Sequence, residues 1–230
     1  MKKISLLSIV LSVLFLNEVE GQRYSRKKID VFQASIIGGF HLSQMDGDSY
    51  TGYDKINPQF GLKSSVYLSS TLFLDVGLSY TSKGAQFESE AINFRASRPK
   101  DRSVHLNYVE VPFTLRWNTS PESSRFYIEG GFSYNRMVSS DIEEEVGEFT
   151  TIVFENFESD FRNWEISSIL GAGYRIGKRS TIGVRFNYGL TKFFINENPR
   201  EENFFTQGLP AEVLFLRNYT LGIQVSYQLL

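Results

Sequence analysis

The sequence predicts an all-β fold: an eight-stranded antiparallel transmembrane β-barrel with short periplasmic turns and long extracellular loops. Three observations support this prediction: an export signal at the N-terminus, stretches in which apolar and polar residues alternate, and connections that are long and short in turn. Outer-membrane barrels have this plan, with their turns in the periplasm and their loops outside the cell. A β-sandwich has no reason to keep such an order, because Greek-key crossovers mix long and short links.

The composition narrows the choice of fold and of partner. The 230 residues carry 24 basic and 26 acidic side chains, so there is no positive excess that would suggest a nucleic-acid partner. The 20 Phe and 12 Tyr favour strands that present rings to lipid or to a core. Cysteine is absent, which excludes disulfides, thiolate metal sites, cysteine nucleophiles and a lipidated cysteine anchor.

The N-terminus is typical of a secretory signal peptide, which we place at residues 1–21. Lys2 and Lys3 provide the positive region, residues 4–16 the apolar segment, and Gly21 a small residue at the cleavage site. The apolar segment is too short for a membrane-spanning helix, which needs about 20 residues. We expect residues 22–32, which are polar and basic, to be a periplasmic lead-in, and residues 33–230 to form the barrel.

Each expected strand has an apolar face and a polar face that alternate with a period of two residues. In a membrane barrel the apolar face contacts lipid and the polar face lines the lumen. The expected strands are residues 33–42, 59–68, 71–82, 104–118, 125–138, 162–177, 181–194 and 218–230. In that order, their apolar faces include Ala34, Ile36, Phe40 and Leu42; Phe60, Leu62 and Val66; Leu74, Val76 and Leu78; Val111, Phe113 and Leu115; Phe126, Ile128 and Phe132; Ile166 and Leu170; Ile182, Val184 and Phe186; and Tyr219, Leu221, Ile223, Val225, Tyr227 and Leu229.

The connections and the polar faces complete this interpretation. Long polar segments at 43–58, 83–103, 139–161 and 195–213 alternate with short links at 69–70, 119–124 and 178–180. We expect the last strand to pair with the first and close the ring. An eight-stranded interior is just wide enough for side chains to fill, so inward charges of opposite sign should pair in a filled lumen. The expected inward charges are Lys63, Arg116, Arg175 and Arg185 against Asp75, Glu110, Glu129 and Glu165.

Aromatic residues near the strand ends predict the interfacial girdles of a membrane barrel. The expected periplasmic girdle is Trp117, Phe126, Tyr174 and Tyr227, and the expected outer girdle is Tyr80, Trp164, Phe193 and Phe215.

Three segments resemble the PorT-type outer-membrane β-barrel family of Bacteroidetes: 46–55 leading into Phe60-Gly61-Leu62, 80–85, and 106–112. Their sequences are DGDSYTGYDK, YTSKGA and LNYVEVP. The resemblance covers residues 33–230 and implies an outer-membrane barrel; some members of the family are implicated in type IX protein secretion. The last residue, Leu230, departs from the terminal Phe that is commonest in outer-membrane barrels, although an apolar residue there still suits the barrel assembly machinery.

From the sequence we predict no catalytic, cofactor-binding or metal site. Of the two histidines, His41 is expected to point inward and His105 outward, so they cannot readily share a catalytic site. Asp46-Gly47-Asp48 with Asp54 resembles part of a calcium loop, but the full spacing and the closing Glu are missing, so we favour a polar turn.

The third long connection is acidic, with 141–145 reading DIEEE, and Phe149, Phe154, Phe157 and Phe161 are interspersed along it. One interpretation is an external patch for a cationic partner or for divalent ions bridging polysaccharide. The interpretation that we favour is a solvated loop, or strands that continue past the membrane as a ribbon. The phenylalanines suggest that it is not wholly disordered, because disordered acidic segments are usually poor in aromatics.

We therefore expect a non-enzymatic outer-membrane protein with a structural or adhesive role, or an accessory role in an envelope or secretion complex. Its expected partners are membrane lipids, the barrel assembly machinery and envelope proteins. The alternatives are a small-solute channel, an outer-membrane enzyme and a secreted soluble β-barrel or lipocalin-like binder.

Overall fold

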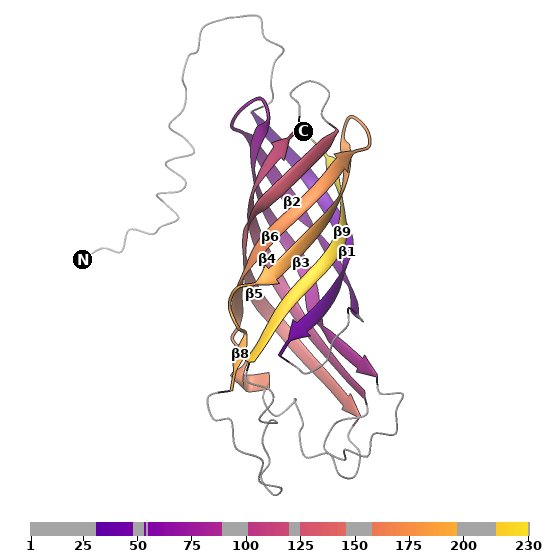
Figure 1. The fold of residues 1–230 in the computed structure, drawn as a ribbon, viewed down its shortest axis with the longest axis vertical. Coiled ribbons are helices and arrows are strands. Elements are labelled where there is room, and N and C mark those ends of the chain that lie inside the picture. Colours follow the sequence, from indigo (N-terminus) through magenta and orange to yellow (C-terminus); the bar gives the residue numbers. More distant parts are fainter. Residues whose placement is uncertain are drawn as a thin grey trace, which may run out of the picture. The chain divides into compact units, whose positions relative to one another are not determined.

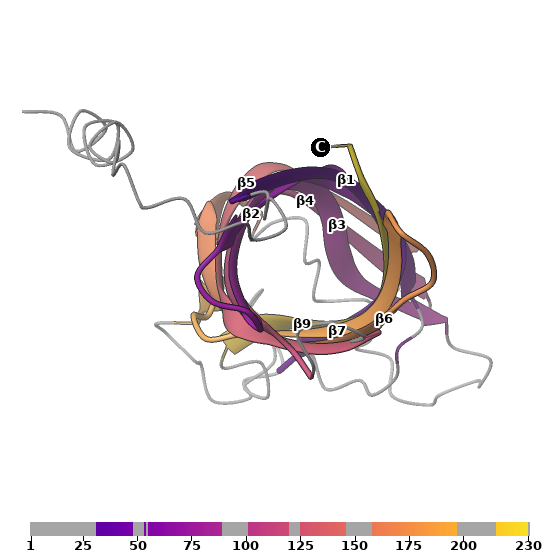
Figure 2. The same ribbon diagram turned by 90° about the horizontal axis from the view of Figure 1, so that it is seen from above.

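Eight antiparallel strands close into a ring in the computed structural model of this chain (Figures 1 and 2). The structure describes residues 31–47, 53, 55–88, 101–119, 125–145, 158–196 and 215–229. No helix among these residues is long and apolar enough to cross a membrane. The strands are β1 (Phe32–Asp46), β2 (Lys55–Tyr67), β3 (Leu72–Glu88), β4 (Asp101–Asn118), β5 (Phe126–Glu145), β6 (Trp164–Arg175), β7 (Ser180–Gly189), β8 (Phe194–Ile195) and β9 (Phe215–Gln228).

The order of strands around the ring confirms the predicted topology. Strands β1 to β7 pair in sequence, β7 pairs with β9, and β9 pairs with β1, with Phe40 opposite Ile223. The two-residue β8 adds a short pairing to one end of β9 and stands outside the ring. The predicted strand 181–194 therefore ends at Gly189, and its last residue begins β8.

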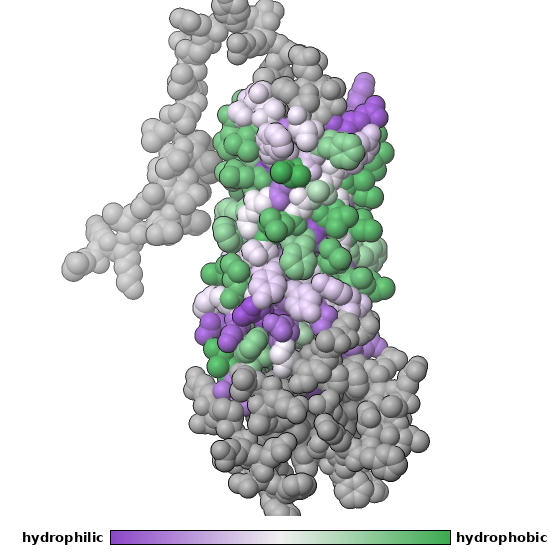
Figure 3. Space-filling model, viewed as in Figure 1, coloured by the Kyte–Doolittle hydropathy of each residue, from purple (hydrophilic) through white to green (hydrophobic). Residues whose placement is uncertain are grey.

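The outer wall of the barrel is apolar, as the alternation predicted. Hydrophobic side chains cover most of the visible wall, and hydrophilic ones gather toward its two ends (Figure 3). Exposed apolar surface of this extent requires a lipid or protein partner. Exposed outward residues include Phe60, Leu62, Leu78, Phe113, Leu115, Phe132, Leu170, Val184, Ile223 and Val225.

Five neighbouring strands are longer than the sequence predicted. β1 and β2 have 15 and 13 residues, so they extend into the expected loop 43–58. β3, β4 and β5 have 17, 18 and 20 residues, so they extend into the expected loops 83–103 and 139–161. A β-bulge at Val138 and Ser139 shifts the register of β5 against Asn107 and Tyr108. The bulge explains why a strict period of two places the end of this strand at Val138: beyond it the inward residues change from odd to even numbers.

The strand ends at the short-turn side agree with the predicted links. The turn between β6 and β7 is closed by hydrogen bonds from the backbone nitrogens of Ile176 and Gly177 to the carbonyl of Ser180. The proposed signal peptide and most of the lead-in, residues 1–30, lie outside the described residues.

Candidate functional site

The lumen is the candidate site, and its periplasmic tier is built around Asp75. The Arg116 guanidinium donates to both carboxylate oxygens of Asp75, at 2.9 and 3.3 Å, and to the hydroxyl of Ser65 at 3.2 Å. The ammonium of Lys63 lies 3.6 Å from the same carboxylate. Arg116 also stacks over the ring of Phe73, with 4.6 Å between guanidinium and centroid. One carboxylate is thus shared by two cations.

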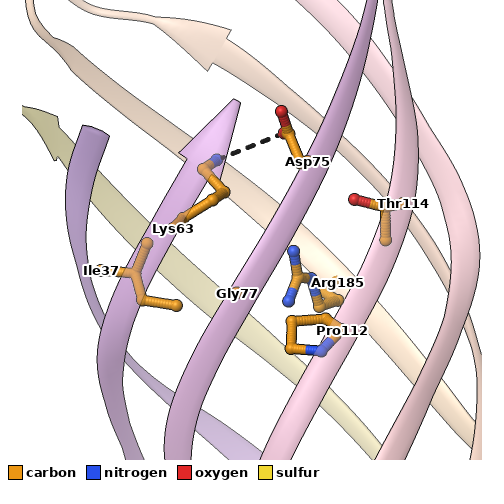
Figure 4. Close-up of a pocket in the computed structure, with 7 residues that line it drawn as sticks. All are labelled: Ile37, Lys63, Asp75, Gly77, Pro112, Thr114 and Arg185. Carbon is orange, nitrogen blue, oxygen red and sulfur yellow. Dashed lines mark ion pairs between the residues drawn. The ribbon is translucent and has the colours of Figure 1, made fainter. Parts of the chain in front are cut away.

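The middle tier contains a second ion pair and an amide-bound carboxylate. Arg185 contacts Glu129 at 2.9 Å, and Glu110 accepts hydrogen bonds from Gln59 at 3.1 Å and Asn187 at 3.3 Å. A small pocket lies between the two tiers, where Lys63, Asp75 and Arg185 point into the lumen (Figure 4).

The upper tier is the most deeply buried part of this network. The Lys83 ammonium lies 2.8 Å from Glu165, and their side chains are 2 % and 0 % exposed. Lys83 also donates to Asn135 at 3.2 Å and lies over the ring of Tyr108, 4.9 Å from its centroid. Asn218 donates to Glu165 at 2.8 Å. Because each charge has several polar partners, burial of the pair is tolerated.

An apolar cluster closes the lumen at the end with the long connections. Phe161 packs edge-on against the rings of Phe193 and Phe194, at 5.2 and 5.9 Å between centroids. The sequence predicted polar side chains throughout the lumen, so this apolar core was not expected. The buried members of this apolar cap are Met45, Val104, Leu106, Tyr108, Ile142, Phe193, Phe194 and Leu216.

The polarity of β4 inverts along its length while its alternation stays in phase. From Trp117 to Val111 the outward residues are apolar, and the inward ones include Arg116 and Glu110. From Asn107 to Ser103 the outward residues are polar, and the inward ones belong to the apolar cap. A lipid-facing wall needs the first arrangement, and a wall surrounded by water needs the second. The inversion near Tyr108 therefore marks where the wall leaves the lipid.

Seven of the eight predicted inward charges lie in the tiers; Arg175 is half-buried at the periplasmic end. The prediction missed Lys83, Lys55 and Arg102, which are all buried. The signal for Lys83 was present: it continues the odd-numbered inward face of β3 through Asp75 and Thr81. Ending the strand at residue 82 assigned it to a loop instead.

The two histidines face opposite sides of the wall, as predicted. His41 is buried in the lumen and bonds the carbonyl oxygen of Ser82 through Nε2 at 2.6 Å. His105 lies on the part of β4 beyond the apolar wall and bonds Ser103 at 3.1 Å. Burial, followed by the charge of Lys55, lowers the pKa of His105.

The other predicted features are placed in part. Asp48 and Asp54 lie outside the described residues, and Gly47 has a φ of 99°, which fits the turn interpretation. Among the described residues, no group of three or more His, Cys, Asp or Glu could hold a metal ion.

The acidic segment 141–145 forms the end of β5, as the ribbon interpretation expected. Phe161, which follows it, packs on the apolar cap, whereas Phe149, Phe154 and Phe157 lie outside the described residues.

One girdle residue was predicted wrongly. Phe193 was assigned to the outer aromatic girdle, but it is 0 % exposed within the apolar cap. It follows β7 where the chain turns toward β8, so strand alternation does not apply to it. Trp117, Phe126 and Tyr227 of the periplasmic girdle are exposed, as that prediction requires.

Comparison with known proteins supports the same architecture. Residues 20–195 match the model of a family described as an outer membrane protein β-barrel domain. The sequence matches none of the curated proteins compared with it.

The fold is similar to Ail, the attachment invasion locus protein of Yersinia pestis (12 % identity, TM-score 0.41, covering 85 % of this chain and 98 % of that one). It is also similar to Neisserial surface protein A (11 % identity, TM-score 0.41, covering 85 % of this chain and 96 % of that one). A third similar structure is OprG from Pseudomonas aeruginosa (11 % identity, TM-score 0.39, covering 85 % of this chain and 95 % of that one).

Proposed function

Because the chain belongs to the outer membrane protein β-barrel domain family, we propose that it is a non-enzymatic outer-membrane protein with an occluded lumen. It acts at its two ends, as a structural or adhesive component or as an accessory of an envelope complex. The observation that supports this proposal most directly is the filling of the lumen. Three polar tiers and the apolar cap occupy the interior in succession.

The extended strands provide a surface for contacts outside the membrane. Beyond the apolar wall, β4 presents Ser103, His105 and Asn107 outward, and Asn107 donates to Ser139 of β5 at 2.9 Å. Because the apolar cap fills the inner face of this ribbon, its outer face is held in a fixed shape. A preformed polar surface of this kind loses little conformational freedom on binding.

We also assign the chain to the PorT-type branch, on the segments that carry the resemblance. Residues 80–85 and 106–112 are paired neighbours on β3 and β4, with Tyr80 opposite Val109 and Lys83 opposite Leu106. These segments supply Lys83, Tyr108 and Glu110 to the lumen. The shared motif thus has a physical role in filling the barrel, which supports common ancestry rather than a common task. Export by a signal peptide at residues 1–21 and insertion by the barrel assembly machinery belong to the same proposal.

Two experiments test this function. Liposomes containing the folded protein should swell in sugar solutions no faster than empty liposomes, and rapid swelling would contradict an occluded lumen. Affinity capture from the native envelope should recover a protein partner. An Asn107→Arg variant should lose that partner, whereas a Lys178→Gln variant, altered at the opposite mouth, should retain it. Equal capture by both variants would argue against the ribbon as the contact surface.

A further inference from the structure

The periplasmic mouth of the barrel holds a small hollow, partly open to solvent, with an unusual lining. Inward side chains of β1, β2, β4, β6, β7 and β9, with the turn between β6 and β7, enclose it. Five of the eleven lining residues are cationic, the other six are hydroxyl or amide side chains, and none is acidic. The cations are Lys63, Arg116, Arg175, Lys178 and Arg179.

Charge is not balanced in this periplasmic vestibule. Asp75 lies directly behind the lining and contacts both Lys63 and Arg116. The other described carboxylates of the lumen lie deeper: Glu129 pairs with Arg185, Glu165 pairs with Lys83, and Glu110 accepts hydrogen bonds from Gln59 and Asn187. Among the residues that the structure describes, five cations line this vestibule, and one carboxylate, that of Asp75, contacts two of them. In a partly enclosed site their mutual repulsion is screened less than on an open surface.

The segment of sequence that precedes β1 is basic. Residues 22–30 carry four basic side chains and a single acidic one, Asp30. The lining also offers hydrogen-bond donors from both edges of the closing seam, because Ser35 belongs to β1 and Ser226 to β9. Hydroxyls, amides and guanidinium groups around one hollow suit an oxyanion with several acceptor oxygens, and arginine pairs with phosphate through two parallel hydrogen bonds.

From this lining we propose that the periplasmic vestibule binds a phosphate-type oxyanion, either free phosphate or the phosphate of a glycerophospholipid headgroup. The anion enters and leaves from the periplasmic side, because the Asp75 and Glu129 tiers occupy the lumen above it. Arg175, Lys178 and Arg179 meet the anion first, and Lys63 and Arg116 form the floor. The proposal does not depend on the function of the extracellular ribbon.

Isothermal titration calorimetry on the full folded barrel in a neutral detergent, in a phosphate-free buffer of low ionic strength, tests this site. Inorganic phosphate and short-chain phosphatidylglycerol are titrated separately. Binding of phosphate by itself identifies the free anion as a sufficient ligand, and binding of phosphatidylglycerol alone identifies the headgroup. Absence of binding by both ligands overturns the proposal.

Variants locate the site. Arg175→Gln and Lys178→Gln should each weaken binding by about tenfold, the loss of one charge-assisted contact. Lys178 lies on the exposed turn, so its variant remains informative if Arg175→Gln fails to fold. Arg136→Gln removes an exposed cation that contacts Asn163 near the other end, and it should leave the affinity unchanged. Equal weakening by Arg136→Gln would mean that net charge alone attracts the anion and would overturn the site.

Discussion

The upper tier of the lumen provides the sharpest test of the ion-paired interior. Glu165→Gln keeps the size of the side chain and removes its charge, so the ammonium of Lys83 loses its anionic partner at 2.8 Å. Removing one member of a buried pair typically costs about 3–5 kcal/mol. The remaining contacts of Lys83, to Asn135 and to the ring of Tyr108, place the expected loss near the lower end, about 3 kcal/mol.

The measurement is urea unfolding of the barrel in phospholipid vesicles, followed by far-ultraviolet circular dichroism. A loss of about 3 kcal/mol reduces the folding equilibrium constant by a factor of about 10². The matched control is the double variant Lys83→Met with Glu165→Gln, which removes both charges. It should be more stable than Glu165→Gln alone, because no unpaired cation remains. An unchanged midpoint for Glu165→Gln, or a double variant at least as unstable, would refute the reasoning.

Three further predictions concern the wall and the middle tier. Ile223→Arg should reduce the yield of folded barrel, because the residue is 56 % exposed on the outer face and arginine near the bilayer midplane costs about 2–4 kcal/mol. The control Asn107→Arg, which lies beyond the apolar wall, should fold normally. Equal yields of the two variants would argue against lipid contact at Ile223. Gly39→Ala should impair folding, because its Cβ would lie 2.1 Å from the carbonyl oxygen of Ile223, whereas the Cβ of Gly38→Ala would meet nothing within 4 Å. Gel mobility with and without boiling compares the folding of the two variants, and identical mobility would contradict this packing. Arg185→Glu should lower the urea midpoint, because it places a second carboxylate beside Glu129; an unchanged midpoint would count against the lumen network.

The wall of the barrel was predictable from local sequence because lipid imposes one rule on every strand. The last strand shows this: Leu221, Ile223 and Val225 lie on the exposed outer face, and Ser226 is buried in the lumen. The same rule selected seven of the tier charges by position alone. The predicted pairing of the first and last strands is also confirmed, as β1 pairs with β9. With an even number of strands and both termini at the short-turn side, these two edge strands can pair antiparallel and close the ring.

The apolar cap was not predictable in this way because its members follow a different rule. Val104 and Leu106 point inward above the lipid, where the outer face is polar and the inner face is a core. Phe193 lies in the connection between β7 and β8 and packs in the same cluster. Ile142 points inward only because the bulge changes which residues of β5 face the lumen. If the apolar face of every strand is assumed to point outward, alternation assigns such residues to loops or to aromatic girdles. Recognising the inversion along β4 would have recovered Val104 and Leu106.

The candidate site is predicted in its composition but not in its connections. Alternation places Asp75 and Arg116 inside the barrel, yet their contact depends on the register between β3 and β4, in which Asp75 lies opposite Thr114. That register is set by the packing of the whole ring and by the short turns. The excess of cations at the periplasmic mouth likewise becomes visible only when six strands and one turn are brought around a common hollow.

Single-channel recording in planar lipid bilayers tests the central claim, an outer-membrane barrel with an occluded lumen, most directly. With the folded wild-type protein inserted, as verified by protease protection of the barrel, we expect no discrete conductance steps under an applied voltage. This result follows from the three polar tiers and the apolar cap, whose buried side chains occupy the interior of the barrel. Stable unitary steps of reproducible size would contradict the account and would favour a small-solute channel.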